Sequence, residues 1–234
     1  MKEFRNAVGA DMLDISGIDR KIGFNRSNSC KLYCSVDLPA ILRGMIDFTG
    51  IKKETFECIL DIAHIKNYDK NTIICYKDDE VDTLLYLFHG SIKAFKNNKY
   101  DKEAIVNLYV SECAMQNEPP LINYDSFVDN VARNTLQTLE PCRILSLQSE
   151  AFKELLKSDI VLSNNLINRA NFVLNELNYF VELSLMDSKA KVIALMQRYP
   201  NILKNVSKKL IASLLNISQE TLSRTLQSIY GVKI

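Results

Sequence analysis

Hydrophobic and polar residues follow two different rhythms along the chain, and the rhythm changes near residue 149. Before this point, short segments rich in β-branched and aromatic residues predict strands, and acidic or Asn-rich turns separate them. Strands at this spacing indicate a β-sandwich or a β-roll. The predicted strands are NTIICY (71–76), TLLYLFHG (83–90), SIKAFK (91–96), AIVNLYV (104–110), NTLQTL (134–139) and CRILSL (142–147).

Apolar residues at helical spacing flank the predicted strands. Residues 52–65 predict one helix, and residues 159–186 predict a long helix without Pro or Gly. Residues 188–199 predict a further helix, which Pro200 ends. Residues 1–45 show no clean periodicity, and we interpret them as a partly ordered extension. The apolar face of the first helix would consist of Phe56, Ile59, Leu60 and Ala63.

The long predicted helix carries a 4-3-4-3 spacing of apolar residues, which is typical of a coiled-coil seam. Other apolar residues lie off this seam, so that one face of the helix could pair with a second chain while another face packs on the β-rich domain. The alternative is an ordinary core helix of a single chain. The seam residues are Leu166, Ala170, Val173, Leu177 and Phe180.

The segment SKKLIASLLNISQETLSRTLQSI (207–229) predicts a helix, a tight turn and a second helix. Ser207 and Ser218 are suited to cap the two helices, and Asn216 tolerates the left-handed conformation that such a turn needs. In the second helix, the residues that face inward would be Leu222, Leu226 and Ile229. The residues left exposed near its N-terminal end would be Gln219, Glu220, Ser223 and Arg224.

These exposed residues have the chemistry of a DNA-reading helix, whose first turns enter the major groove. Arg suits bidentate contact with guanine, and Glu suits acceptance of a hydrogen bond from cytosine N4. A generic amphipathic helical hairpin is the alternative.

Charge is distributed unevenly, since residues 189–234 hold eight Lys/Arg and one acid, whereas the other 188 residues hold 21 basic and 27 acidic residues. This asymmetry indicates a nucleic-acid-binding module joined to another domain. The candidates for phosphate contact are Lys189, Lys191, Lys208, Lys209 and Ser218.

The motif S-Q-E-T-L-S-R-T-L resembles the recognition-helix signature of the CRP/FNR family of bacterial transcription regulators, in which E-T-x-S-R recurs. In this resemblance, Glu220 and Arg224 match the base-reading Glu and Arg of the family. Ser223 matches the Ser of FNR-like members, and Gln219 stands where the cyclic-AMP receptor type has Arg. Upstream, residues 68–95 are similar to the start of the family's cyclic-nucleotide-type β-roll.

The resemblance implies an α+β fold with a jelly-roll sensor domain, a dimerisation helix and a winged helix-turn-helix domain. We expect a 1–50 extension, a 51–158 sensor β-roll, a 159–186 dimerisation helix and a 187–234 DNA-binding domain. The family's winged domain has a β-hairpin after the recognition helix, so with the last residue at Ile234 we expect a wing that is either truncated or lies beyond this sequence.

The implied function is that of a cytoplasmic, homodimeric transcription regulator. It would read a pseudo-palindromic operator in double-stranded DNA with the helix at about 218–229, respond to a signal at the β-roll and contact RNA polymerase. The alternative is a cyclic-nucleotide-fold protein-interaction module that does not bind DNA. No Ser/His/Asp set, P-loop or H-E-x-x-H motif is present, so we do not expect an enzyme. No apolar run reaches the ~18 residues that a membrane span needs.

The residues that match the family's phosphate cradle argue against a cyclic nucleotide. Gly90 is the one glycine between residues 51 and 230, and Ser111-Glu112 stands where nucleotide-binding members have G-E. Arg133-Asn134 stands where they have R-S or R-T. A phosphate cradle relies on the close backbone approach that glycine permits.

A metal cofactor has weak support in the sequence. FNR-type members hold an iron–sulfur cluster, and here Cys30, Cys34 and Cys142 would need Cys58 or Cys113 as a fourth ligand. The C-x₃-C spacing is not the family's cluster pattern. For haem, the two imidazoles are those of His64 and His89. We expect inert thiols, structural histidines and no cofactor.

Overall fold

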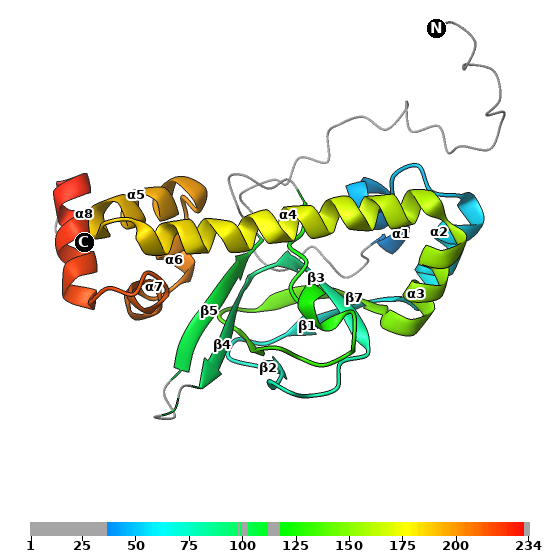
Figure 1. Ribbon diagram of the computed structural model, residues 1–234, viewed down its shortest axis with the longest axis horizontal. Coiled ribbons are helices and arrows are strands. Elements are labelled where there is room, and N and C mark those ends of the chain that lie inside the picture. The colour runs from blue at the N-terminus through cyan, green and yellow to red at the C-terminus, as the bar shows by residue number, and fades with distance from the viewer. Residues whose placement is uncertain (1–36, 98, 100–102, 112–117, 232–234) are drawn as a thin grey trace, which may run out of the picture.

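The computed structural model describes residues 37–97, 99, 103–111 and 118–231, and it contains a β-roll with a long helix along one side and shorter helices at both ends (Figure 1). In this part of the chain a three-stranded sheet has the order β1-β7-β3, and a four-stranded sheet has the order β2-β6-β4-β5. Every strand pair is antiparallel. The strands are β1 (Ala63–Tyr68), β2 (Ile73–Cys75), β3 (Thr83–His89), β4 (Ser91–Asn97), β5 (Glu103–Val110), β6 (Thr135–Thr138) and β7 (Cys142–Gln148).

The six predicted strands are confirmed as β2 to β7, whereas β1 is a strand that the sequence pattern does not predict. The prediction extended the helix of 52–65 through the residues that begin this strand. The helix, α2 (Lys53–Ile62), ends where Ala63 starts to pair with Leu147 of β7. His64 therefore lies on an exposed strand position and does not end a helix as expected.

The alternation of side chains along β3 creates two hydrophobic layers. Leu84 and Tyr86 face a core shared with the helices, whereas Leu85 and Leu87 face the core between the two sheets. Both faces of the three-stranded sheet are thus covered at β3, which explains why the residues of this strand form a continuous apolar run. The turn after β3 requires Gly90, because its φ is +100° and an added Cβ would lie 2.6 Å from the Cys142 Sγ.

Part of the predicted N-terminal extension belongs to the first of these cores. Helix α1 (Leu38–Gly44) and the short helix η1 (Ile46–Phe48) bring three apolar side chains into it. Leu42, Met45 and Phe48 are each at most 4% exposed. The weak periodicity of 1–45 concealed this contribution because the apolar residues are divided between two short helices. Cys30 and Cys34 lie outside the described residues.

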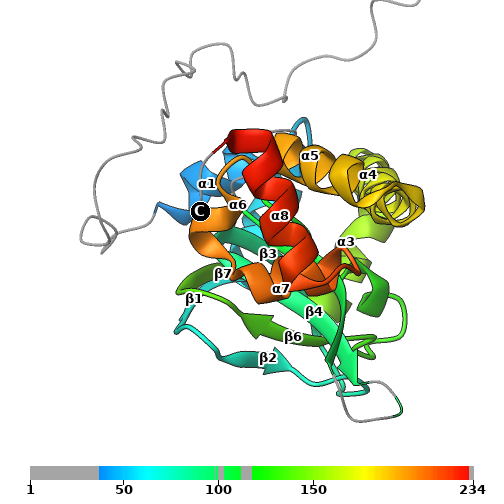
Figure 2. The same ribbon diagram turned by 90° about the vertical axis from the view of Figure 1, so that its left-hand side faces the viewer.

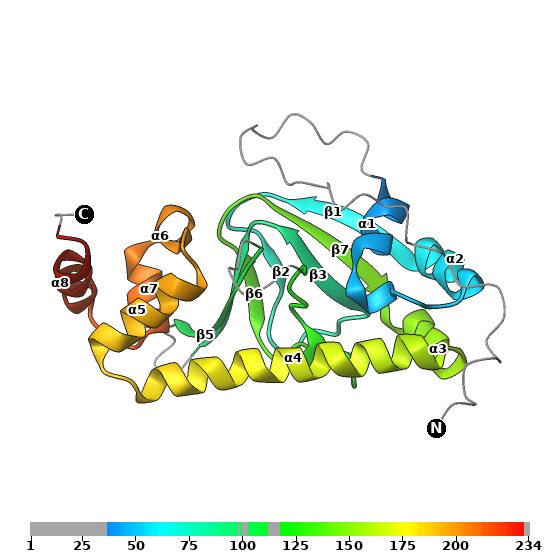
Figure 3. The same cartoon turned by 90° about the horizontal axis from the view of Figure 1, so that it is seen from above.

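A long helix, α4 (Ile160–Leu185), runs beside the roll and connects it to the C-terminal helices (Figures 1 and 3). It follows α3 (Ser149–Ser158), and a second short helix, η2 (Tyr124–Ser126), lies in the loop before β6. Arg169 of α4 makes a buried ion pair with Asp47 of η1, with 3.0 Å between Nε and Oδ2. The Asn165 side-chain amide also donates to the Asp47 carbonyl at 3.1 Å. These contacts hold the N-terminal helices against α4.

Four helices form the C-terminal unit, which Figure 2 shows from the end of the molecule. Its core includes two residues of the roll, Leu108 and Val110, which lie on the opposite face of β5 from Tyr109. The unit is therefore packed on β5, with α7 as the helix in contact. No helix in the described part of the chain is long and apolar enough to cross a membrane. The helices are α5 (Ser188–Arg198), α6 (Ile202–Asn205), α7 (Lys208–Leu214) and α8 (Gln219–Tyr230).

Asp159 joins the start of α4 to the start of α2. Its carboxylate accepts hydrogen bonds from the Val161 and Leu162 N–H groups, the Lys52 N–H at 3.1 Å and the Thr55 hydroxyl at 2.8 Å. Burial raises the pKa of Asp159, but these hydrogen bonds lower it, and the pKa lies below its ordinary value.

We predict that Asp159→Ala lowers the free energy of unfolding at pH 7 by about 2–3 kcal/mol, because it removes a helix cap and leaves buried donors without an acceptor. The folded protein binds the Asp159 proton more weakly than the unfolded chain does. The stabilisation is therefore complete above the ordinary pKa of 3.8 and is lost as the pH falls below it. Urea unfolding at several pH values tests this, with Asp61→Ala at an exposed position as the control. Equal stability of the two variants at pH 7 would contradict the prediction.

Candidate nucleic-acid interface

The turn between α7 and α8 has the conformation that the sequence predicts. The Ser207 hydroxyl accepts a hydrogen bond from the Leu210 N–H at 3.3 Å, and the Ser218 hydroxyl accepts one from the Thr221 N–H at 3.0 Å. Asn216 has a left-handed backbone with a φ of 52°. Both caps and the turn residue are therefore confirmed, since each depends on local chemistry that the sequence displays directly.

Helix α8 has one buried face and one exposed face. Leu222 and Leu226 are at most 1% exposed and belong to the core of the C-terminal unit, with Ile229 packed beside them. The Arg224 guanidinium lies 3.5 Å from the Glu220 carboxylate, and both side chains are at least 70% exposed. An ion pair this exposed is weak, so both groups remain available to a partner. The residues on the exposed face include Gln219, Glu220, Ser223 and Arg224.

The lysines near α8 have different environments. Lys189 and Lys209 are exposed and Lys208 is half-buried. Lys191 is 9% exposed, and its Nζ donates to the Leu215 carbonyl at 3.3 Å. The structure therefore corrects the expectation that Lys191 contacts phosphate, because its ammonium points into the C-terminal unit. The Ser218 hydroxyl is engaged in the cap of α8.

The predicted seam of α4 lies between two stripes of residues along the helix. One stripe, which includes Leu162 and Leu166, is buried, and the other is exposed. Leu166 is 8% exposed in the single chain, and Val173 packs against the same core of the roll. Phe180 packs against the core of the C-terminal unit. Leu166 is thus buried by its own chain, which corrects the expectation that it faces a partner, whereas Ala170, Val173 and Phe180 are half-buried. Leu177, at 42% exposure, lies closest to the outer surface among the large seam residues.

A second stripe on α4 is exposed and recurs every seven residues. At about 100° of rotation per residue, it lies roughly 130° around the helix from the buried stripe. This seven-residue repeat is present in the sequence, but the apolar residues of α4 also fit the register of the predicted seam, and the sequence alone does not distinguish the two. Its members are Ile160, Ile167, Leu174 and Val181, which are 72%, 58%, 55% and 61% exposed, and Leu185, at 83%, lies beside them.

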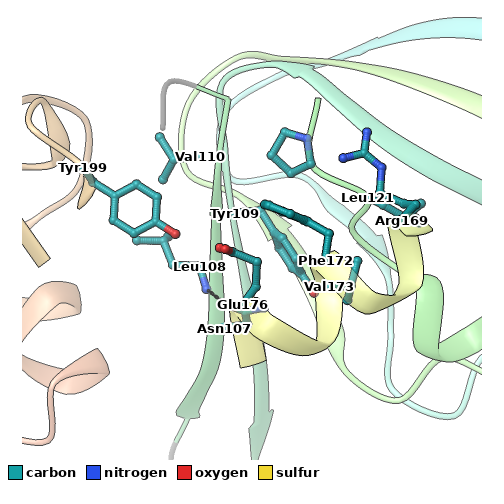
Figure 4. A pocket seen from close by; sticks show the side chains of 11 residues that line it. Asn107, Leu108, Tyr109, Val110, Leu121, Arg169, Phe172, Val173, Glu176 and Tyr199 are labelled. Atoms are coloured by element: carbon teal, nitrogen blue, oxygen red, sulfur yellow. Dashed lines mark hydrogen bonds between the residues drawn. The ribbon is translucent and has the colours of Figure 1, made fainter. Parts of the chain in front are cut away.

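A small cavity lies between β5 and α4 (Figure 4). Tyr109, Phe172 and Tyr199 contribute aromatic rings to its wall, and Arg169 and Glu176 contribute charges. The space for water is about 30 Å³, far below the several hundred Å³ of a small-molecule site. Both charges are already paired.

Glu176 of α4 forms an ion pair with Arg198 of α5. The Arg198 guanidinium also lies 4.2 Å from the centroid of the Tyr179 ring, a cation–π contact. These interactions join the long helix to the C-terminal unit. Arg169, in turn, is paired with Asp47, and burial raises the pKa of Asp47 although the guanidinium lowers it.

The described residues at the positions of the phosphate cradle do not fit a cyclic nucleotide. Arg133 is ion-paired with Asp129, and the Asn134 amide donates to the Asp125 carboxylate at 3.2 Å. Burial raises the pKa of Asp125. Ser111, Arg133 and Asn134 are not glycines, so these described positions lack the close backbone approach that a phosphate cradle uses.

The candidate metal ligands that the structure describes, His64, His89 and Cys142, do not form a metal site. Within the described ranges no group of three His, Cys, Asp or Glu side chains could hold a metal ion. His64 and His89 are exposed at different strand positions. Cys142 is buried, and its thiol donates to the Ser91 and Glu140 carbonyls at 3.4 and 3.2 Å. Cys113 lies outside the described residues.

Comparisons with known proteins support the fold. Residues 65–159 match the family model of the cyclic nucleotide-binding domain. FixK2 from Bradyrhizobium japonicum is 13% identical, with a TM-score of 0.58, over 73% of this chain and 85% of that one. CLP, a c-di-GMP responsive global regulator of Xanthomonas campestris, is 16% identical, with a TM-score of 0.54, over 76% and 91%. A comparison with curated protein sequences gives no significant match. The chain therefore contains a cyclic nucleotide-binding-type β-roll, joined to helices as in these structures.

The environment of the thiols predicts their reactivity. Burial raises the pKa of Cys142 to about 11, whereas Cys58 is exposed on α2. At pH 8 only about one Cys142 thiol in a thousand would be the reactive thiolate. We expect iodoacetamide to alkylate Cys58 at least about a hundredfold faster than Cys142, as measured by peptide mass spectrometry, and similar rates in urea. Equal rates in the native protein would show that Cys142 is accessible as a ligand.

Proposed function

We propose that this protein is a transcription regulator that binds double-stranded DNA as a homodimer. Each chain would place the N-terminal half of α8 in the major groove of one half-site of a pseudo-palindromic operator, and RNA polymerase is the partner that the family resemblance implies. The β-roll would receive the controlling signal. The observation that carries the proposal is the division of α8 into a buried apolar face and an exposed face of Gln219, Glu220, Ser223 and Arg224.

The chemistry of this exposed face fits base edges. Arg224 offers two parallel N–H donors that match guanine O6 and N7, and Glu220 offers an acceptor to cytosine N4. The two residues are one turn apart, so they address neighbouring base pairs of one half-site. Both side chains are at least 70% exposed, so they can exchange their weak ion pair for contacts with bases.

The surroundings of α8 fit the phosphate backbone. The last 46 residues carry seven more positive than negative charges. Lys189, Lys208 and Lys209 are the candidates for phosphate contact, and Lys191 is excluded from this set because it is buried. Phosphate contacts would set the position of the dimer on the duplex, whereas the residues of α8 would select the sequence.

The exposed stripe of α4 supports the dimer. Ile167, Ala170, Leu174, Leu177 and Val181 alternate at spacings of three and four residues along the outer side of α4, which is the pattern by which two helices pair. A two-fold axis beside α4 would place two copies of α8 on one side of the assembly, as half-sites one helical turn apart require. In this proposal the outer stripe replaces the seam that the sequence analysis selected.

The alternative is a protein-interaction module with the same fold, in which the C-terminal helices bind protein. The lysines around α8 favour DNA over this alternative, because phosphate contacts use Lys and Arg, whereas Lys is depleted in protein–protein interfaces. The two functions differ in whether the protein selects any DNA sequence.

The dimer surface can be tested at Leu174. We expect Leu174→Asp to produce monomers at concentrations where the wild type is a dimer, because two unpaired charges would be buried in an apolar interface. Analytical ultracentrifugation measures the state. Leu174 is 55% exposed, so the chain itself should stay folded, whereas Val173 supports the core of the roll and is unsuitable. Asn168→Asp adds the same charge at an exposed position outside the stripe and should remain dimeric. A dimeric Leu174→Asp variant would exclude the stripe.

Base reading can be tested by selection of binding sites from random duplex DNA. We expect Arg224→Ala to lose about 1–3 kcal/mol per half-site and to relax the preference at one G·C pair. Lys209→Ala, at an exposed position on α7, should weaken binding to all sequences and leave the preference unchanged. The division of roles is wrong if the Arg224 variant retains the wild-type preference while the Lys209 variant changes it. If the wild type selects no sequence, the protein-interaction alternative stands.

A further inference from the structure

A buried lysine contacts the turn that precedes the proposed reading helix. Lys191 belongs to α5, is 9% exposed and lies in the core of the C-terminal unit beside Val192 and Leu215, which are 0% and 3% exposed. Its Nζ donates to the Leu215 carbonyl at 3.3 Å. A buried ammonium is costly unless it is hydrogen-bonded, so this contact is a specific feature of the fold.

The Leu215 carbonyl lies at the end of α7, where a helix leaves its last carbonyls without helical donors. The turn supplies donors for earlier carbonyls. The Asn216 N–H donates to Ser213 at 3.1 Å, and the Ile217 N–H donates to Ala212 at 2.9 Å. The Leu215 carbonyl instead takes its hydrogen bond from Lys191, a cation at the negative end of the helix.

We propose that Lys191 is a positioning residue that sets the orientation of α8, and this inference rests on the proposed DNA-binding function. Three residues separate Leu215 from Gln219, where α8 begins. Helix α5, which carries Lys191, also packs against α8. The hydrogen bond of Lys191 therefore fixes the position of the turn relative to a helix that contacts α8. A change of backbone angles at Leu215 or Asn216 would rotate all four reading residues together, since they share one rigid helix.

Lys191→Met removes the donor and keeps the apolar stem, and Lys204→Met is the matched control because it removes the same charge from an exposed position on α6. We expect Lys191→Met to lose about tenfold in affinity for the operator selected by the wild type, the equivalent of one base contact. Its affinity for random duplex should fall no more than that of Lys204→Met. Lys191→Arg, which retains a charged donor, should recover operator affinity.

A second readout does not depend on DNA. Amide hydrogen exchange at Asn216 and Ile217 should be at least about tenfold faster in Lys191→Met than in Lys204→Met, at a temperature well below unfolding of both. A merely stabilising role would lower the melting temperature and leave the ratio of operator to random-duplex affinity unchanged, which would overturn the proposal.

The two readouts separate this inference from the function on which it rests. If the wild type fails to bind an operator, the DNA-binding proposal fails, while exchange at the turn still tests the contact with Lys191. If the wild type binds and Lys191→Met matches Lys204→Met in both measurements, the positioning role is refuted. Should Lys191→Met fail to fold, the comparison of Lys191→Arg with the wild type decides, because a positioning role requires that the arginine variant keeps the sequence preference.

Discussion

The long helix α4 carries apolar residues on two of its sides. The arrangement of the roll and the C-terminal unit depends on which of these sides is buried. One side is covered by the chain itself, with Leu162 and Leu166 in the core of the roll and Leu183 in the core of the C-terminal unit. The buried Arg169–Asp47 pair fixes the rotation of the helix, because a charged group at 5% exposure tolerates few other orientations. The other side carries Ile160, Ile167, Leu174 and Val181, which the described part of the chain leaves exposed.

The same helix couples the roll to the C-terminal unit. Glu176 is paired with Arg198 of α5, and it also lines the cavity against β5. Leu108 and Val110 of β5 complete the core of the C-terminal unit from the other side. The four C-terminal helices are thus held by two independent contacts, one with α4 and one with the roll. A displacement of β5 relative to α4 would change both contacts.

Local chemistry determined which features could be predicted from the sequence. The caps Ser207 and Ser218 and the turn residue Asn216 act within three or four residues, so they were found with their partners. Strands β2 to β7 follow from their dense β-branched and aromatic composition. Strand β1 was missed because Ala63 continues the apolar spacing of α2, and only its pairing with Leu147, 84 positions away, makes it a strand.

The errors concern features that depend on tertiary contacts. The apolar residues of α4 fit a 4-3-4-3 spacing in more than one register, and the roll decides which stripe is buried. The sequence pattern does not distinguish Lys189 from Lys191, yet the side chain of Lys191 is buried in the core and that of Lys189 faces solvent. The α1 and η1 segments become part of the core because α4 and the roll together cover them, and neither segment alone has a recognisable period.

We propose that two basic C-terminal units on one dimer hold double-stranded DNA. Its most direct test is the affinity of the wild-type protein for duplex DNA as a function of salt concentration, measured by fluorescence anisotropy. Three lysines from each chain, Lys189, Lys208 and Lys209, would give six phosphate contacts. The logarithm of the affinity should then fall linearly with the logarithm of the salt concentration, with a slope of about −5. Binding that is absent at low salt, or that does not change with salt, would contradict the account.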